Sequence, residues 1–220
     1  MDIAELVNAL RGYSVAILSD DAYGAVLFVN HITSVMCGNS EDVVFVVYRE
    51  STCRKLYRIM LSLREENRCI DKFFESVKVV KVGKTPETCF GELVAFVEDN
   101  ENIVDVAAEI GRILRNKFPE STIVFFGFNL GIQIYEVSNI VRALEELFSR
   151  IRNTTYFVVS SREVTDLMAN VFDVVVCISK IESFGMRPNN IYNVYIEHSI
   201  ISRIQQMPLY RIDEMGLVEL

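Results

Sequence analysis

The residues best placed for chemistry lie between an apolar segment at 13–18 and a second apolar segment at 25–36. The first segment predicts a strand, the second predicts a helix, and residues 19–24 predict a tight polar turn. Such a turn binds phosphate when it reads G-x-x-x-x-G-K-[ST], because backbone N–H groups surround the phosphate and the lysine binds its outer oxygens. Only the second glycine of that pattern is present, and the first lysine of the chain is Lys55. In the same register the chain reads Ser19, Asp20, Asp21, Ala22, Tyr23, Gly24, Ala25 and Val26.

Asp20 and Asp21 oppose phosphate binding at this turn. A carboxylate about 4 Å from a phosphate charge is repelled by roughly 4 kcal/mol at an effective dielectric of about 20. The positive end of the helix dipole contributes on the order of 1 kcal/mol, which does not offset two carboxylates. We therefore expect one aspartate to cap the helix and Gly24 to close the turn. One alternative stays open, in which an aspartate holds a divalent cation that in turn binds an anion.

The remaining reactive residue types form no recognisable catalytic or metal-binding pattern. His31 lies on the predicted core helix, where a buried imidazole with a hydrogen-bond partner is expected. The five cysteines show no C-x-x-C spacing, so a zinc site is not expected. Cys53 is the best candidate for a reactive thiol, because it lies near a predicted helix start and beside Arg54. We expect no catalytic residue, no metal and no cofactor.

Composition and charge limit the partners of the chain. It has 220 residues, 50% of them hydrophobic, and a formal net charge of −8. An acidic balance of this size argues against a nucleic-acid surface and against an anionic membrane. The acidic N-terminus is unlike a secretory signal, and no apolar run approaches the roughly 20 residues that span a bilayer. We expect a soluble, cytoplasmic protein. The one dense cationic cluster is expected to be a solvated helix face: Arg54, Lys55, Arg58, Arg64 and Arg68.

Apolar segments alternate with amphipathic segments along most of the chain. Continuous apolar runs, as at 43–48 and 122–128, predict central parallel strands that are covered on both faces. Amphipathic runs, as at 102–118 and 134–151, predict the intervening helices, with Val137 among the inward positions. Ser51 or Thr52 is expected to cap a helix that starts near Cys53. The alternation predicts an α/β fold with a mostly parallel central sheet sandwiched by helices.

Residues 183–190 (SFGMRPNN) are the clearest linker signal in the sequence. Three short apolar segments follow it and predict antiparallel strands that close one edge of the sheet. We therefore expect a core at 1–182 and, at 183–220, a linker with a C-terminal β-hairpin packed on the same sheet, so that the chain forms one domain overall.

With its elements in this order, the chain resembles the RecA/KaiC-like branch of the P-loop ATPases, and more closely the small archaeal members of that branch. Besides the strand–turn–helix at 13–36, three places carry the resemblance. The run 45–51 (FVVYRES) is similar to the strand and turn in which the family keeps a carboxylate that activates water, and Glu50 falls at that position. The run 123–129 (IVFFGFN) falls in the slot of the Walker B strand, with Gly127 where the family has its metal-organising aspartate. The runs 154–160 and 173–177 are similar to the last core strands of the family, and 208–218 to its C-terminal edge hairpin.

The resemblance implies a scaffold whose nucleotide site has been lost. The lysine of the phosphate-binding turn and the aspartate at position 127 are absent. The Lys-x-Arg that the family places near its last hairpin is also absent, because no lysine follows Lys180. Glu50 remains as a possible remnant acid, without a phosphate or metal clamp beside it.

The leading hypothesis is a non-catalytic domain that serves as a protein-interaction or regulatory module. The resemblance implies a protein partner or self-association; nucleotide binding is not expected. The alternative is an enzyme or sensor that binds a ligand or a divalent metal in the crevice at the carboxyl ends of the strands, through Asp20, Asp21 and Glu50.

Overall fold

The computed structural model describes most of the chain in ten stretches. Asp20, Asn129 and most of the predicted linker lie outside them. The described residues are 3–19, 21–39, 41–64, 76–100, 102–128, 136–159, 165–181, 190–205, 209–213 and 216–219.

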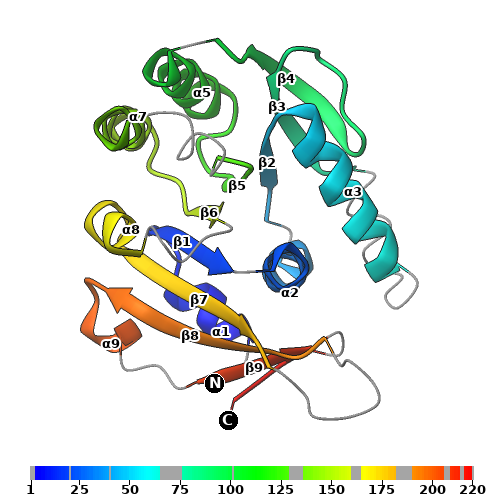
Figure 1. The fold of residues 1–220 in the computed structure, drawn as a ribbon, viewed down its shortest axis with the longest axis vertical. Coiled ribbons are helices and arrows are strands. Elements are labelled where there is room, and N and C mark those ends of the chain that lie inside the picture. The colour runs from blue at the N-terminus through cyan, green and yellow to red at the C-terminus, as the bar shows by residue number, and fades with distance from the viewer. Residues whose placement is uncertain are drawn as a thin grey trace.

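One mixed sheet runs through the molecule (Figure 1). Its ten described strands lie in the order β10-β9-β8-β7-β1-β6-β5-β2-β3-β4. All pairs from β7 to β4 are parallel, whereas β8, β9 and β10 add to the β7 edge as antiparallel strands. The expected α/β fold class is therefore confirmed. The strands are β1 (Ser14–Ser19), β2 (Val43–Tyr48), β3 (Lys78–Gly83), β4 (Glu92–Glu98), β5 (Thr122–Phe126), β6 (Thr155–Val159), β7 (Val174–Lys180), β8 (Tyr192–Ser199), β9 (Tyr210–Asp213) and β10 (Gly216–Glu219).

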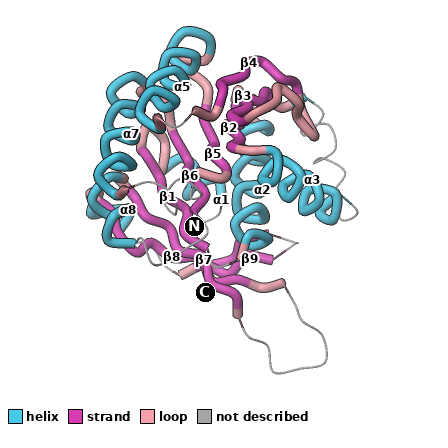
Figure 2. The backbone as a smooth tube through the Cα atoms, turned by 45° about the horizontal axis from the view of Figure 1, so that its top comes forward, coloured by secondary structure: helices cyan, strands magenta, loops and turns pink. Residues whose placement is uncertain are grey.

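Helices cover both faces of the sheet (Figures 1 and 2). Within β1, Val15 and Ile17 pack on the side of α1, α2 and α3, while Ala16 and Leu18 pack on the side of α5 and α7. The central strands repeat this alternation, which explains why their sequences are apolar at every position. No described helix has the length and apolar character needed to cross a bilayer. The helices are α1 (Ile3–Ala9), α2 (Ala22–Gly38), α3 (Glu50–Arg64), α5 (Ile103–Lys117), α7 (Val137–Arg150), α8 (Thr165–Val171) and α9 (Ser202–Gln205).

Helix α2 begins three residues earlier than the sequence suggested. Asp21 caps it, because its Oδ1 accepts a hydrogen bond of 2.8 Å from the backbone N–H of Tyr23 and its carbonyl accepts the N–H of Ala25. The expected capping by an aspartate is thus confirmed for Asp21. The expected role of Gly24 is wrong, because Gly24 already lies in the helix and does not close the turn.

Two further expectations about helices are corrected. Helix α3 begins at Glu50, so Ser51 and Thr52 lie in its first turn and do not precede it as caps. Val137 was expected to face the core, but it is the first residue of α7 and is 57% exposed. Each error comes from a helix end, where periodicity carries least information.

Candidate functional site

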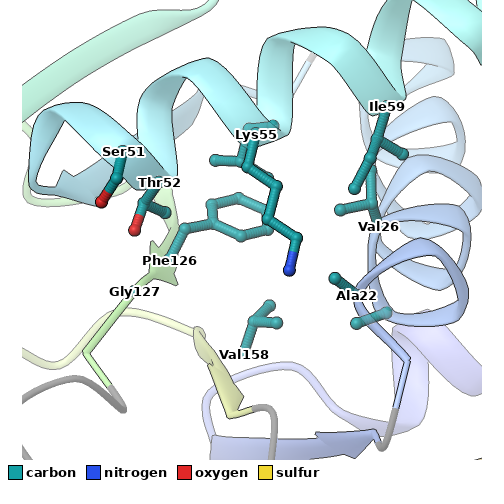
Figure 3. A pocket seen from close by; sticks show the side chains of 11 residues that line it. Ala22, Val26, Ser51, Thr52, Lys55, Ile59, Phe126, Gly127 and Val158 are labelled. Carbon is teal, nitrogen blue, oxygen red and sulfur yellow. The ribbon is translucent and has the colours of Figure 1, made fainter.

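A pocket of about 240 Å³ opens at the carboxyl ends of the central strands (Figure 3). It lies between the first turns of α2 and the first half of α3, above the ends of β5 and β6. The sheet order explains the gap. Helices α2 and α3 follow β1 and β2, and these two strands are separated in the sheet by β6 and β5. The helices that follow β5 and β6, α7 and α8, lie on the opposite face, so no described helix fills the space between α2 and α3. Crevices of this kind are where open α/β sheets bind ligands.

The pocket wall is mostly apolar, with a few polar groups contributed by α3. The apolar part comes from α2, α3 and the two strand ends, and Ser51, Thr52 and Lys55 supply the polar side chains. None of the described residues that line the pocket is an Asp, Glu, His, Cys or Tyr. The lining residues are Ala22, Ala25, Val26, Ser51, Thr52, Lys55, Leu56, Ile59, Phe126, Gly127 and Val158.

Lys55 brings the single cation of the lining into the pocket. Its side chain extends from α3 in front of the Phe126 ring, and its ammonium lies between Val158 and Ala22 (Figure 3). Lys55 is exposed, and no described carboxylate forms an ion pair with it. The sequence pointed only to a solvated basic face. The sequence did contain a clue that Lys55 faces this site: it lies one helical turn after Ser51, near the start of a helix that follows a central strand.

Gly127 gives the pocket its shape at the end of β5. Its φ angle is +82°, and a Cβ atom built on it would lie 2.6 Å from Thr52 Oγ1 and 3.0 Å from the Tyr48 carbonyl oxygen. Both the backbone conformation and the close approach require glycine. The aspartate that the resemblance implies at this position is therefore absent from the sequence and also has no space in the structure.

The carboxylate of Asp21 is engaged by the C-terminal part of the chain. Besides capping α2, it accepts a hydrogen bond of 2.9 Å from the Tyr192 hydroxyl and lies 4.0 Å from Lys180 Nζ. The Tyr192 ring packs so closely on α2 that a Cβ atom at Gly24 would lie 2.6 Å from it. The one glycine that matches the phosphate-binding pattern is thus explained by contact with this ring.

Glu50 faces the opposite flank of the site. Its Oε1 accepts hydrogen bonds from the backbone N–H groups of Lys84 and Thr85, and it lies 3.3 Å from the ammonium of Lys81, whose side chain is fully buried. Burial raises the pKa of Glu50, but hydrogen bonds from its own backbone N–H, from Thr85 and from Lys81 outweigh that effect and lower the pKa to about 2. Glu50 is therefore an ionised anchor that ties the start of α3 to β3 and to the loop after it.

The predicted site residues are only partly brought together. Ala22 lines the pocket, whereas the side chains of Asp21 and Glu50 bind partners on different strands, β8 and β3. Asp20 lies outside the described residues. Within the described residues, no group of three His, Cys, Asp or Glu side chains is arranged to hold a metal ion. His31 is half-buried, and its Nε2 lies 3.0 Å from the Asp213 carbonyl oxygen, which confirms the expected hydrogen-bonded imidazole.

Comparisons with known proteins identify the fold and no family. No protein-family model matches the chain, and no curated protein matches its sequence. Among the solved structures that match is one of a protein from Pyrococcus horikoshii OT3, studied as Project ID PH0250. It has a TM-score of 0.63 and 16% sequence identity, and the match covers 93% of this chain and 95% of the Pyrococcus chain. At this identity the likeness shows a shared α/β fold, and function has to be argued from the site.

Proposed function

We propose that the chain is a non-catalytic regulatory module of the RecA/KaiC-like type that binds a small organic anion in the strand-end pocket. The observation that carries this proposal is the Lys55 ammonium, which lies unpaired among described residues at the mouth of an apolar pocket. A ligand with an apolar body and one carboxylate would place its body against Phe126 and Val158 and its charge at Lys55.

Pocket size and charge favour such a ligand over a nucleotide. Typical small-molecule pockets span about 300–1,000 Å³, so a volume of about 240 Å³ suits a small molecule. A nucleoside triphosphate carries several negative charges, whereas the described lining offers one lysine. The turn before α2 is also short, because β1 ends at Ser19 and α2 begins at Ala22, so few backbone N–H groups are available around a phosphate.

The lining favours binding over acid–base catalysis, because its described residues offer no second titratable group to act with Lys55. General acid–base catalysis needs a titratable group within hydrogen-bond reach of the substrate, and Lys55 is the one such side chain in the described lining. Glu50, the carboxylate that the resemblance places next to reacting water, is held by Lys81 and the backbone of Thr85 instead.

The direct test is a thermal-shift and calorimetric comparison of benzoate, isovalerate, Mg-ATP and ADP on the full chain. We expect a carboxylate to bind the wild-type protein and to lose about ten- to one-hundredfold in affinity in Lys55→Met, because a hydrogen bond to a charged group contributes about 1.5–3 kcal/mol. Arg58→Met is the matched control, since it removes a cation of the same helix that does not line the pocket. Absence of carboxylate binding, or Mg-ATP binding that survives Lys55→Met, would overturn the proposal.

A protein partner is the second candidate function, and the outer side of α3 supports it. Tyr57 and Leu61 lie one turn apart on this helix and are 38% and 37% exposed. Because the other side of α3 lines the pocket, a partner on this surface would sense the bound ligand.

We propose a second copy of the chain as the first partner to test on this surface. Light scattering should show a mass that rises with concentration in the wild type and stays monomeric in a Tyr57→Ser, Leu61→Ser variant.

A further inference from the structure

Two cysteines from distant parts of the chain meet beside the pocket helix. Cys53 lies in the first turns of α3 and is 1% exposed, and Cys89 lies in the loop between β3 and β4. The backbone N–H of Cys89 donates a hydrogen bond of 3.2 Å to Cys53 Sγ, across 36 positions of sequence. Both thiols are free. Since the Sγ of Cys89 is three bonds from that nitrogen, the two sulfur atoms lie within reach of one another.

The two thiols differ in a way that suits a reversible reaction. Cys89 is exposed, so a soluble disulfide reaches it, whereas Cys53 is buried and its Sγ is contacted by Thr88 and Cys89 of the loop. The loop is also held at its other end, because Glu50 Oε1 accepts the backbone N–H groups of Lys84 and Thr85. Glu50 and Cys53 are one helical turn apart, so the loop is fastened twice to the same turn of α3.

We propose that Cys53 and Cys89 form a reversible intramolecular disulfide that locks the β3–β4 loop to helix α3. This is a modification site on the side of α3 that faces away from the pocket. Among Cys53, Cys89 and Cys177 no other pair is placed for it, because Cys177 lies inside strand β7.

The reaction is thiol–disulfide exchange with a low-molecular-weight disulfide such as glutathione disulfide. The Cys89 thiolate attacks one sulfur of glutathione disulfide, whose S–S bond breaks and releases one glutathione thiolate. The Cys53 thiolate then attacks the Cys89 sulfur of the mixed disulfide and displaces the second glutathione. Two protein thiols are oxidised, one external disulfide is reduced to two thiols, and the two protons pass to the departing glutathiones.

Neighbouring groups set the pH dependence of the first step. Burial and the Cys53 sulfur raise the pKa of the Cys89 thiol, while Arg54 and Lys81 act in the opposite direction. Because the thiolate is the attacking species, the exchange should accelerate as the pH rises above neutrality.

The consequence for the pocket rests on the proposed function. Helix α3 carries Ser51, Thr52 and Lys55 on its pocket side and Cys53 on the other side. A disulfide that fixes this part of α3 removes part of the ordering cost of binding. We therefore expect the oxidised protein to bind a small carboxylate about three- to tenfold more tightly than the reduced protein.

To test this, the full chain is equilibrated in buffers with an increasing ratio of oxidised to reduced glutathione. The samples are quenched with acid, digested without a reductant, and their disulfide-linked peptides are mapped by mass spectrometry. The expected result is a peptide that links Cys53 to Cys89, which disappears on addition of dithiothreitol. Cys89→Ser should retain a free Cys53 thiol, and Cys69→Ser is the control that should leave the linked peptide unchanged. A stable glutathione adduct on Cys89 with Cys53 still free, or linkage of either residue to another cysteine, would overturn the proposal.

Benzoate affinity is then measured on the oxidised and reduced proteins. Formation of the disulfide without any change in affinity would overturn the coupling to the pocket and leave the modification site in place. Failure of both forms to bind benzoate would instead count against the proposed function, because the linked peptide is detected without any ligand.

Discussion

Lys81 is fully buried in β3, and the carboxylate of Glu50 is its counter-charge. The alternation of β3 turns Lys81 toward α3, where an apolar residue would otherwise be expected. Gly83 keeps the space open, because a Cβ atom there would lie 2.5 Å from both Glu50 Oε1 and Lys81 Nζ. The carboxylate at the position where the family keeps its water-activating acid therefore stabilises a charged side chain inside the protein.

Replacement of Glu50 by Gln should lower the free energy of unfolding by about 1–3 kcal/mol at pH 7, because it leaves a buried ammonium without its counter-charge. Urea denaturation measures this change. Glu109→Gln is the matched control: it removes the carboxylate of an exposed pair with Arg112 and should cost at most about 0.5 kcal/mol. Equal effects of the two substitutions would contradict the structural role of Glu50.

The difference between wild type and Glu50→Gln should also depend on pH. The pKa of Glu50 is lowered from 4.5 to about 2 in the folded chain, so its stabilising contribution is complete above about pH 4.5 and is lost as the pH falls toward 2. Denaturation curves between pH 7 and pH 2 should therefore converge for the two proteins at the acid end. A constant difference across this range would show that the carboxylate charge is unimportant.

Gly24 offers a second test, at the contact between α2 and the C-terminal strands. Alanine is favoured over glycine in a helix by about 1 kcal/mol, but its Cβ atom would lie 2.6 Å from the buried Tyr192 ring. Overpacking of this kind costs about 1–3 kcal/mol. We expect Gly24→Ala to lower the melting temperature and Gly38→Ala, which meets nothing within 4 Å, to leave it unchanged or raise it. A stabilised Gly24→Ala would refute the packing role of the ring.

Among the elements, helix α3 combines several roles on different sides. Lys55 and Thr52 line the pocket, Cys53 contacts the β3–β4 loop, and Tyr57 and Leu61 are exposed. If α3 moves as a rigid element, we expect a change on one side to reach the others, which would link the proposed disulfide to the pocket and to the exposed side.

Closure of the Cys53–Cys89 disulfide should stabilise the fold. For a loop closed across 36 positions, the chain-entropy estimate falls between about 3 and 5 kcal/mol. Urea denaturation of the oxidised wild type against the same protein with dithiothreitol measures the gain, and Cys89→Ser should show no difference between the two conditions. A loss of stability on oxidation would mean that the bond strains α3.

Sequence patterns predicted the elements well and the site poorly, for one physical reason. Strands and helices follow local periodicity, so the parallel core and the antiparallel edge were both recoverable. Gly24 is needed because of its contact with the Tyr192 ring, and Gly127 because of its close approach to the Tyr48 carbonyl oxygen. Both partners are distant in the sequence, so the residues next to each glycine do not reveal why it is there. The direction of Lys55 likewise depends on where β5 and β6 end relative to α3.

For the molecule as a whole, His31 joins helix α2 to the C-terminal strands of the sheet. It lies on α2, and its Nε2 contacts the carbonyl of Asp213, the last residue of β9. Burial lowers the pKa of His31 below 6.5, although Asp213 acts in the opposite direction. Burial is the larger effect, so a protonated His31 is disfavoured in the folded chain even though its contact with Asp213 favours the protonated ring.

The lowered pKa of His31 determines how the stability of the fold changes with pH. The unfolded chain binds the proton more readily than the folded chain, so stability should fall as the pH drops below about 6.5, by up to about 1.4 kcal/mol per pH unit for one group. His31→Gln should flatten the curve between pH 7 and pH 5, measured by urea denaturation. His198→Gln removes the other histidine and leaves the Asp213 contact intact, so a flattened curve in that variant instead would contradict the assignment.

The position of β1 at the centre of the sheet affects how the chain is made. Its neighbours β6 and β7 begin at Thr155 and Val174, and Ser14 bonds to Asp173, 159 residues further along. At about 5–20 residues per second of translation, these partners emerge from the ribosome roughly seven to thirty seconds after β1. During that interval the nascent chain carries an apolar strand with both edges open, which is the type of segment that chaperones bind.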